Sequence, residues 1–202
     1  SFPPAAIKRD LALMLRAARE ADVPLLIGSA GTAGGKPHLE LVRDIVLEIA
    51  AEHGLEFRLA LIHAEQDQSY LLERFEQGRI KPLNPAPSID APTIADAGRV
   101  VGMVGPEPYL RAIDEGAQVV IAGRSSDCAI FAGIPIREGI PEGIAWHAAK
   151  ILECGAAAVE QRISPDCLFA TCSQNHFDVE PLDERLRCTP QSVAAHGLYE
   201  NS

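Results

Sequence analysis

A short apolar run, a glycine-rich loop and a helical pattern follow one another near the start of the chain. Residues 23–27 read Val-Pro-Leu-Leu-Ile, which is too short for a helix and is typical of a buried parallel strand. The next eight residues contain four glycines, and residues 37–49 then carry apolar side chains at helical spacing. Because parallel strands need a crossover between them, usually a helix, this order constrains the chain to an α/β fold.

The same order recurs along the chain. Further strands are predicted over residues 57–62, 100–104, 119–122 and 167–171, and helices over residues 7–18, 69–77, 107–115, 143–159 and 190–199. Residues 1–202 are therefore expected to form one α/β domain. Its sheet is expected to be mostly parallel with helices on both faces, in a doubly wound, Rossmann-like arrangement of three layers. Residues 79–98 contain four prolines and predict a long irregular excursion that serves function or subunit contact.

The composition disfavours several classes of protein. There are 28 Asp and Glu against 18 Lys and Arg, and the net charge of −10 opposes binding to nucleic acid or to an anionic membrane. No segment approaches the roughly 18 consecutive apolar residues of a membrane span. The five cysteines form no CxxC pair, so free thiols in a reducing cytoplasm are expected. A local group of N–H donors and cations could still bind a small anion.

Polar residues and glycines gather where the predicted strands end. Ligands bind at the carboxyl ends of the strands in open parallel sheets, because loops and helix N-termini converge there. Five loops are expected to share that edge: residues 29–36, 63–67, 105–107, 124–127 and 174–176. The alternative is that Gly, Asp and Asn only form turns and helix caps at these places.

The glycine-rich loop does not match a nucleotide-binding motif. Pro37 stands where a P-loop needs Ser or Thr, and the glycines do not have the spacing of a dinucleotide turn. Gly31, Gly34 and Gly35 remain candidates for binding a carboxylate or phosphate through backbone N–H groups. A plain tight turn between buried elements is the alternative.

Two further loops offer ionisable pairs. Arg124 could bind a carboxylate in a bidentate way beside Asp127 as a base, or the two could form a structural pair in which Asp127 caps a helix. His63 and Asp67 could form an imidazole–carboxylate pair for proton transfer. Either residue of this second pair could instead satisfy only local hydrogen bonds.

Ionisable residues in the last third of the chain complete the set of candidates. Asn175, His176 and Asp178 form a cluster after a predicted strand. Lys150 lies on a polar stripe of a predicted helix, where it is either a base or part of a solvated face. No HExxH or similar spacing is present, so no metal site is expected.

Five segments, taken in order, carry a resemblance to a known family. They are Ile27-Gly28-Ser29-Ala30-Gly31 with Gly34-Gly35, Ile121-Ala122-Gly123-Arg124-Ser125-Ser126-Asp127, His147 with Ile151-Leu152-Glu153-Cys154-Gly155, Asn175-His176-Phe177, and Cys188-Thr189-Pro190 with the segment from Ser192 to Glu200. Together they resemble the acyclic terpene utilisation family, the AtuA-like proteins. Members typically extend beyond both Ser1 and Ser202, so the resemblance implies a large N-terminal piece of a longer protein. It also implies a bacterial cytoplasmic protein of branched or terpenoid acid catabolism, often alongside a small companion domain, and it supplies no reaction.

The residues and the resemblance favour an enzyme that acts on a small or branched carboxylic acid or its CoA thioester. The expected chemistry is hydration, elimination or isomerisation by acid/base catalysis, as in a lyase, hydratase or isomerase. The anionic group would be held by Gly31, Gly34, Gly35, Arg124 and Asn175, and protons would be moved by Asp127, His63, Lys150 and His176. No cofactor is expected. The protein is expected to form a homo-oligomer. The alternative is a non-catalytic subunit whose glycine loop and excursion serve binding and assembly with a companion protein.

Overall fold

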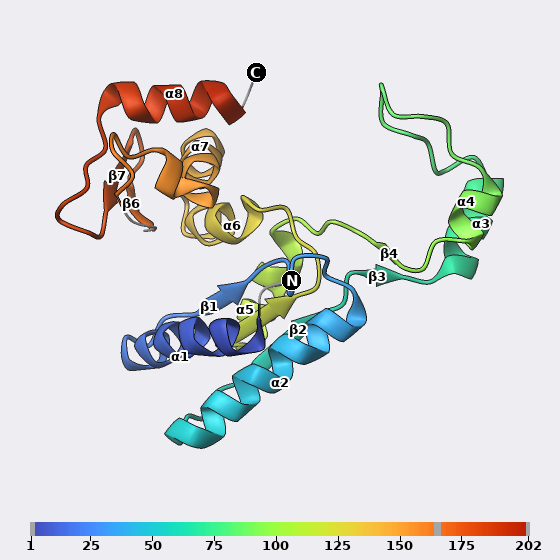
Figure 1. The fold of residues 1–202 in the computed structure, drawn as a ribbon, viewed down its shortest axis with the longest axis horizontal. Helices are drawn as coiled ribbons and strands as arrows, with labels where there is room; N and C mark the ends of the chain where they lie inside the picture. Colours follow the sequence, from blue (N-terminus) through green and yellow to red (C-terminus); the bar gives the residue numbers. More distant parts are fainter. Residues whose placement is uncertain (1–2, 164–166, 201–202) are drawn as a thin grey trace. The chain divides into compact units, whose positions relative to one another are not determined.

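The computed structural model describes residues 3–163 and 167–200, which divide into two compact units (Figure 1). Unit 1 comprises Ser1–Val104 and Glu115–Ser125, and unit 2 comprises Gly105–Asp114 and Ser126–Ser202. The resemblance implies that the protein extends beyond Ser1 and Ser202. Both of these residues lie outside the described part of the chain.

Each unit has its own helices and strands. Unit 1 contains α1 (Pro4–Glu20), β1 (Leu25–Ile27), α2 (Lys36–His53), β2 (Leu59–Ile62), β3 (Glu65–Gln66), α3 (Gln68–Glu76), α4 (Ala91–Ala95), β4 (Val100–Val101) and β5 (Val119–Ala122). Unit 2 contains α5 (Glu107–Asp114), α6 (Ala129–Arg137), α7 (Glu142–Glu153), the short 3-10 helix η1 (Gly155–Ala157), β6 (Leu168–Cys172), β7 (Phe177–Pro181) and α8 (Pro190–Glu200). The α/β class predicted from the sequence is confirmed.

A three-stranded parallel sheet forms the centre of unit 1. The strand β5 is fully buried and lies between β1 and β2, in the order β1-β5-β2. Ile121 pairs with Ile27 of β1 and with Leu61 of β2, so the three strands end at one edge. The loops that follow them therefore begin side by side.

Helices α1 and α2 cover one face of this sheet. Leu15 of α1 and Ile49 of α2 are fully buried, and they share a core with Val119 and Ile121 of β5. Because the buried residues of both helices recur at helical spacing, each helix presents one apolar stripe to the sheet. Burial of a side chain of this size contributes about 1.5–3 kcal/mol to stability. Burial of these apolar residues therefore stabilises the packing of both helices on the sheet.

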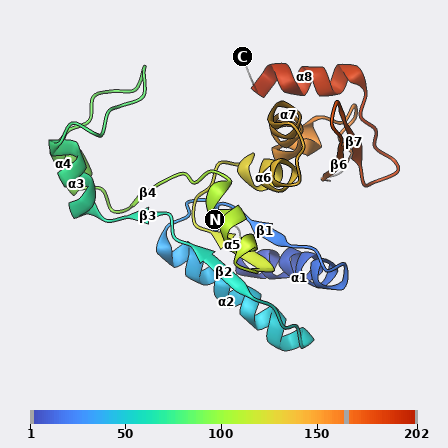
Figure 2. The ribbon, with the colours of Figure 1, turned by 180° about the vertical axis from the view of Figure 1, so that it is seen from behind.

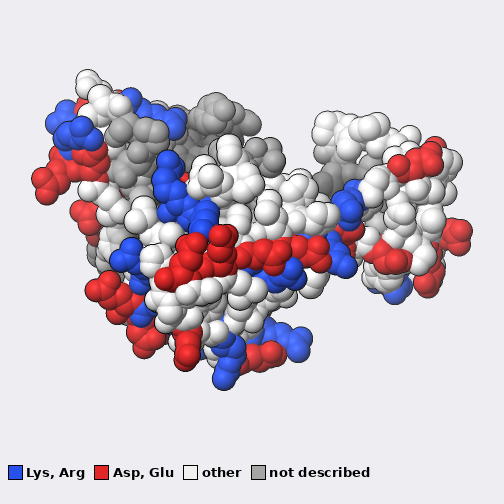
Figure 3. Space-filling model, turned by 60° about the horizontal axis from the view of Figure 1, so that its bottom comes forward, with Lys and Arg blue, Asp and Glu red and all other residues white. Residues whose placement is uncertain are grey.

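Acidic and basic side chains lie beside one another on the protein surface. Lys8 of α1 lies 2.8 Å from a carboxylate oxygen of Glu48 and 2.6 Å from one of Glu52, both on α2. On the face that Figure 3 shows, acidic groups are abundant and Lys and Arg side chains lie among them. Exposed pairs of this kind contribute little individually, so they leave packing of the apolar faces as the main source of stability.

Two of the strands expected in the parallel sheet belong elsewhere. The strand β4 pairs antiparallel with β3, with Glu65 opposite Val101, and β6 pairs antiparallel with β7, with Cys172 opposite Phe177. The prediction of a single mostly parallel sheet is therefore wrong for residues 100–101 and 167–171, while Val104 forms an isolated parallel bridge with Ser125 just beyond β5. An apolar pattern identifies a strand but not its partner or direction, which tertiary contacts decide.

Two aspartates begin the helices that follow β3. The carboxylate of Asp67 accepts a hydrogen bond from the backbone N–H of Tyr70 at 3.0 Å and starts α3, and that of Asp90 accepts from Thr93 at 2.9 Å and starts α4. The Pro-rich excursion thus contains one short helix, and α3 packs against it. Figures 1 and 2 show that β3 and β4 connect this helix pair to the rest of unit 1.

Unit 2 is built around two packed helices, α6 and α7. The helix α6 is not predicted by the sequence, because Pro135 lies inside it. The helix expected over residues 143–159 ends earlier, at Glu153, and η1 follows it. Within the part of the chain that the structure describes, none of the helices has the length and apolar character that crossing a bilayer requires.

Candidate functional site

Three loops meet at the carboxyl edge of the parallel sheet. The N–H of Ala30 donates to the carbonyl of Ala122 at 3.0 Å, and the N–H of Gly123 donates to the carbonyl of Ile62 at 2.9 Å. A Cβ atom added to Gly34 would lie 2.4 Å from the carbonyl carbon and oxygen of Gly123. Only glycine fits at Gly34, because backbone packs directly on backbone there.

The glycine-rich loop follows an unusual backbone path. Gly31 and Gly34 have φ angles of +57° and +72°, and Ser29 and Thr32 also adopt left-handed conformations. A guanidinium nitrogen of Arg124 donates to the carbonyl of Thr32 at 3.1 Å and so ties this loop to the end of β5. These observations support the tight-turn interpretation of Gly31 and Gly34 and give Arg124 a part in holding the loop.

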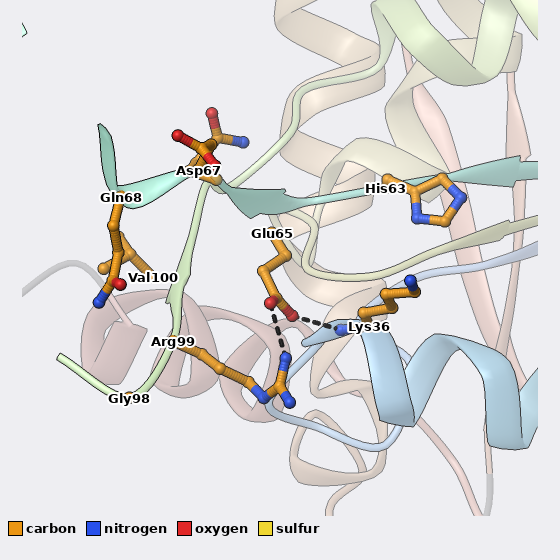
Figure 4. Close-up of a pocket in the computed structure, with 9 residues that line it drawn as sticks. Lys36, His63, Glu65, Asp67, Gln68, Gly98, Arg99 and Val100 are labelled. Carbon is orange, nitrogen blue, oxygen red and sulfur yellow. Dashed lines mark hydrogen bonds and ion pairs between the residues drawn. The ribbon is translucent and has the colours of Figure 1, made fainter. Parts of the chain in front are cut away.

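A cavity of about 330 Å³ opens beside these loops, between the start of α2 and the β3–β4 ribbon (Figure 4). It is lined by nine residues of unit 1: Lys36, His63, Glu65, Gln66, Asp67, Gln68, Gly98, Arg99 and Val100. Most of these side chains are polar or charged. We refer to this cavity as the Glu65 pocket.

Both carboxylate oxygens of Glu65 accept hydrogen bonds within the pocket. Its Oε2 atom accepts a hydrogen bond from the backbone N–H of Lys36 at 2.7 Å, and its Oε1 atom accepts one from Arg99 at 2.6 Å (Figure 4). The hydrogen bond from the Lys36 N–H lowers the pKa of Glu65 most, and Arg99 lowers it further against the opposing effect of partial burial. Glu65 is therefore an ionised carboxylate at neutral pH.

Gly35 lies directly against this ion pair. A Cβ atom added to Gly35 would lie 3.2 Å from Cδ of Arg99 and 3.3 Å from Oε2 of Glu65. Gly35 is the residue before α2 and has an ordinary extended backbone, with φ −69°. Its lack of a side chain leaves the ion pair room to reach the start of α2.

His63 and Asp67 both line the pocket and have different surroundings. His63 is exposed and directly follows β2, and Figure 4 shows the Lys36 side chain extending toward the end of the pocket where the imidazole lies. The Asp67 carboxylate accepts hydrogen bonds from the Ser69 hydroxyl and the Tyr70 N–H, and both lower its pKa. Asp67 therefore serves as the cap of α3, in place of the expected pairing with the imidazole.

Lys150 and Asp127 belong to unit 2. The ammonium group of Lys150 pairs with Glu153, whose other carboxylate oxygen accepts a hydrogen bond from the Cys128 thiol at 3.1 Å. Burial, followed by the interaction with Glu153, raises the pKa of Cys128 to about 12, so this thiol is protonated at neutral pH. Asp127 is exposed in the turn before α6.

Asn175 and His176 form the turn of the β6–β7 hairpin. Nδ1 of His176 lies 2.7 Å from Oδ1 of Asn175 and 2.9 Å from the Ser173 hydroxyl, and its Nε2 lies 3.5 Å from Asp178. The placement of this loop at the edge of the parallel sheet was thus a wrong prediction, because β6 pairs only with an antiparallel neighbour among the described strands. Residues 105–107 follow Val104, which forms an isolated parallel bridge with Ser125 just beyond β5, and they do not follow one of the three strands of that sheet.

The pocket brings together only part of the predicted set. His63 lines it and Gly35 adjoins it, while Gly31, Gly34 and Arg124 build the neighbouring loop junction. Three charged residues of the pocket are not among the site residues predicted from the sequence: Lys36, Glu65 and Arg99. Lys36 and Glu65 stand within loops singled out for their position, whereas Arg99 carries no such signal. No group of three or more His, Cys, Asp and Glu residues that could hold a metal ion is found among the described residues.

Comparison with known proteins gives one match. A family model described as "Acyclic terpene utilisation family protein AtuA" matches residues 6–161. The matched span includes every residue that lines the Glu65 pocket. Neither the search of curated proteins nor that of solved structures gave a match.

Proposed function

Since this chain belongs to the acyclic terpene utilisation family AtuA, we propose that the Glu65 pocket binds a small or branched carboxylic acid, or its CoA thioester, and changes it by proton transfer. The observation that carries the proposal is the pocket itself. At the edge of a parallel sheet where ligands commonly bind, it combines two cations with an imidazole.

The two cations suit recognition of a carboxylate. The planar guanidinium of Arg99 can bind carboxylate oxygens in a bidentate way, and Lys36 adds an ammonium group on a flexible stem. In a thioester the carbonyl oxygen would take the place of a carboxylate oxygen. A volume of about 330 Å³ lies at the lower end of the range for small-molecule pockets and fits a short branched acid.

The imidazole of His63 is the group proposed to move the proton. Imidazole is the side chain whose unperturbed pKa lies nearest to neutral pH, whereas Glu65 and Asp67 are held ionised by their hydrogen bonds. In hydration, the oxygen of water adds to Cβ of an unsaturated acid and a proton adds to Cα; elimination is the reverse, and isomerisation moves one proton. Each reaction needs a group that exchanges a proton and a cation that stabilises negative charge on the carboxyl or carbonyl oxygen.

Ligand binding is the first test. Isovalerate and branched acyl-CoA compounds are titrated into the protein by calorimetry, and a ligand that binds the native state also raises the unfolding temperature. We expect Arg99→Ala to weaken binding about tenfold or more, because a charged hydrogen-bonding partner is lost. Arg9→Ala is the matched control, since Arg9 is an exposed arginine of α1 that pairs with Asp10.

Proton transfer is tested separately from binding. We expect wild-type protein in D₂O to incorporate deuterium at Cα of a bound acid or thioester, and His63→Ala to bind the ligand with little change while losing the exchange. Binding without exchange in the wild type would indicate the alternative, a non-catalytic binding subunit. Absence of binding by all of these compounds would refute the proposal.

A further inference from the structure

We propose that Glu65 makes the pocket selective for ligands with a single negative charge, so that it accepts monocarboxylates and disfavours dicarboxylates and phosphate. This inference rests on the proposed function of the same pocket and names its substrate class.

The charges that line the pocket are balanced before any ligand binds. Lys36 and Arg99 supply two positive charges, and Glu65 and Asp67 supply two negative charges. The Asp67 carboxylate is engaged at the start of α3, while Glu65 reaches across the pocket to the start of α2 and to Arg99 (Figure 4). A pocket built for a dianion would instead carry an excess of cations.

The position of Glu65 fixes how much positive charge remains for a ligand. Its two oxygens take the Lys36 N–H and one donor of Arg99, so the charge of Arg99 is largely matched by Glu65. The Lys36 side chain is 61% exposed, and its ammonium nitrogen lies 4.0 Å from a carboxylate oxygen of its ion-pair partner Glu40. One ligand carboxylate can therefore pair with Lys36 and with the outer edge of the guanidinium.

A second negative charge on the ligand would face carboxylates. The side chain of Glu65 is 27% exposed, so its charge is only partly screened by water. Two like charges about 6 Å apart in a wet pocket, with an effective dielectric constant of about 40 to 80, change a binding constant by a factor of about three to ten. That factor is the selectivity expected from Glu65.

The test compares two five-carbon acids that differ by one charge. Isovalerate, methylsuccinate and inorganic phosphate are titrated by calorimetry into wild-type protein and into Glu65→Gln, at a pH where both carboxyl groups of methylsuccinate are ionised. We expect wild-type protein to bind isovalerate more tightly than methylsuccinate, and Glu65→Gln to shift the ratio of the two dissociation constants toward methylsuccinate about three- to tenfold. The amide oxygen of glutamine can still accept the Lys36 N–H, so the pocket is kept.

Two control variants isolate the effect of charge in the pocket. Asp44→Asn removes one negative charge from α2 outside the pocket lining and is expected to leave the ratio unchanged. Glu65→Asp keeps the charge and is expected to keep the preference for isovalerate. Tighter binding of methylsuccinate or phosphate by the wild type, or an unchanged ratio in folded Glu65→Gln, would overturn the inference while leaving carboxylate binding in place. If none of the compounds binds to either protein, the proposed function fails and the inference fails with it.

Discussion

The close approach of Gly34 to Gly123 predicts a large loss of stability when Gly34 is replaced by alanine. The added Cβ would lie 2.4 Å from the Gly123 carbonyl carbon and oxygen and 2.6 Å from the Arg124 nitrogen. All three atoms are backbone atoms at the end of the central strand β5, so no side-chain rotation can relieve the contact. Either the loop or the strand end must move.

The cost has two parts. Gly34 has φ +72°, and a left-handed conformation costs an alanine roughly 1–2 kcal/mol. Overpacking against well-packed atoms costs about 1–3 kcal/mol more. Gly34→Ala is therefore expected to lower the free energy of unfolding by about 2–5 kcal/mol, a large part of the about 5–15 kcal/mol typical of a folded domain.

Gly54→Ala is the matched control. Gly54 has φ +62° at the end of α2, and an added Cβ there meets nothing within 4 Å. This variant carries only the conformational cost of about 1–2 kcal/mol. Urea unfolding followed by far-UV circular dichroism measures both variants, and the difference between them isolates the steric cost. Equal losses in the two variants would refute the tight packing of the glycine loop on β5.

Three further predictions concern buried or anchored groups. Because the pKa of Cys128 is raised to about 12, iodoacetamide at neutral pH should label Cys128 more slowly than the exposed Cys167. Glu153→Gln removes one cause of the raised pKa and should speed the labelling of Cys128. Peptide mass mapping measures both labelling rates, and equal rates for the two cysteines would contradict the prediction. His196 is 4% exposed, and neither ring nitrogen has a hydrogen-bond partner among the described residues. Because a buried polar group without a partner costs stability, His196→Leu should keep or raise the free energy of unfolding measured in urea. A loss of more than about 1 kcal/mol in this variant would contradict the prediction. The pKa of Glu65 is lowered in the folded protein, so its stabilising contribution is present above the unfolded-state pKa of a glutamate and is lost as the pH falls through the folded pKa. The difference in stability between wild type and Glu65→Gln should then disappear on acidification, and a difference that persists in acid would exclude Glu65 as its cause.

Elements with a strong apolar period are predictable from the sequence. The strand predicted over residues 119–122 coincides with β5, and the helix pattern after the glycine loop falls within α2. Both patterns reflect local burial in the same core. The sequence does not predict the helix α6, because Gly133 and Pro135 disfavour a helix there, whereas packing on α7 favours it.

The pocket was only partly predictable, because its walls depend on very short strands. The strands β3 and β4 each have two residues, which is too few to show an alternating pattern. Their register places Glu65 opposite Val101 and brings Arg99 to the Glu65 carboxylate. The sequence predicts a functional loop over residues 63–67. It does not show that a segment more than thirty residues later forms the opposite wall of the pocket.

The strand order gives Gly34 a structural role that the sequence pattern does not reveal. A glycine-rich turn before a helix looks alike whether its glycines admit a ligand or another backbone. Because β5 lies between β1 and β2, the loop after β1 must cross the end of β5, and Gly34 and Gly123 lie against each other there. That contact accounts for Gly34 without a ligand, whereas Gly35 faces the ion pair of Glu65 and Arg99. Of the three predicted glycines, Gly35 is therefore the one that adjoins the Glu65 pocket.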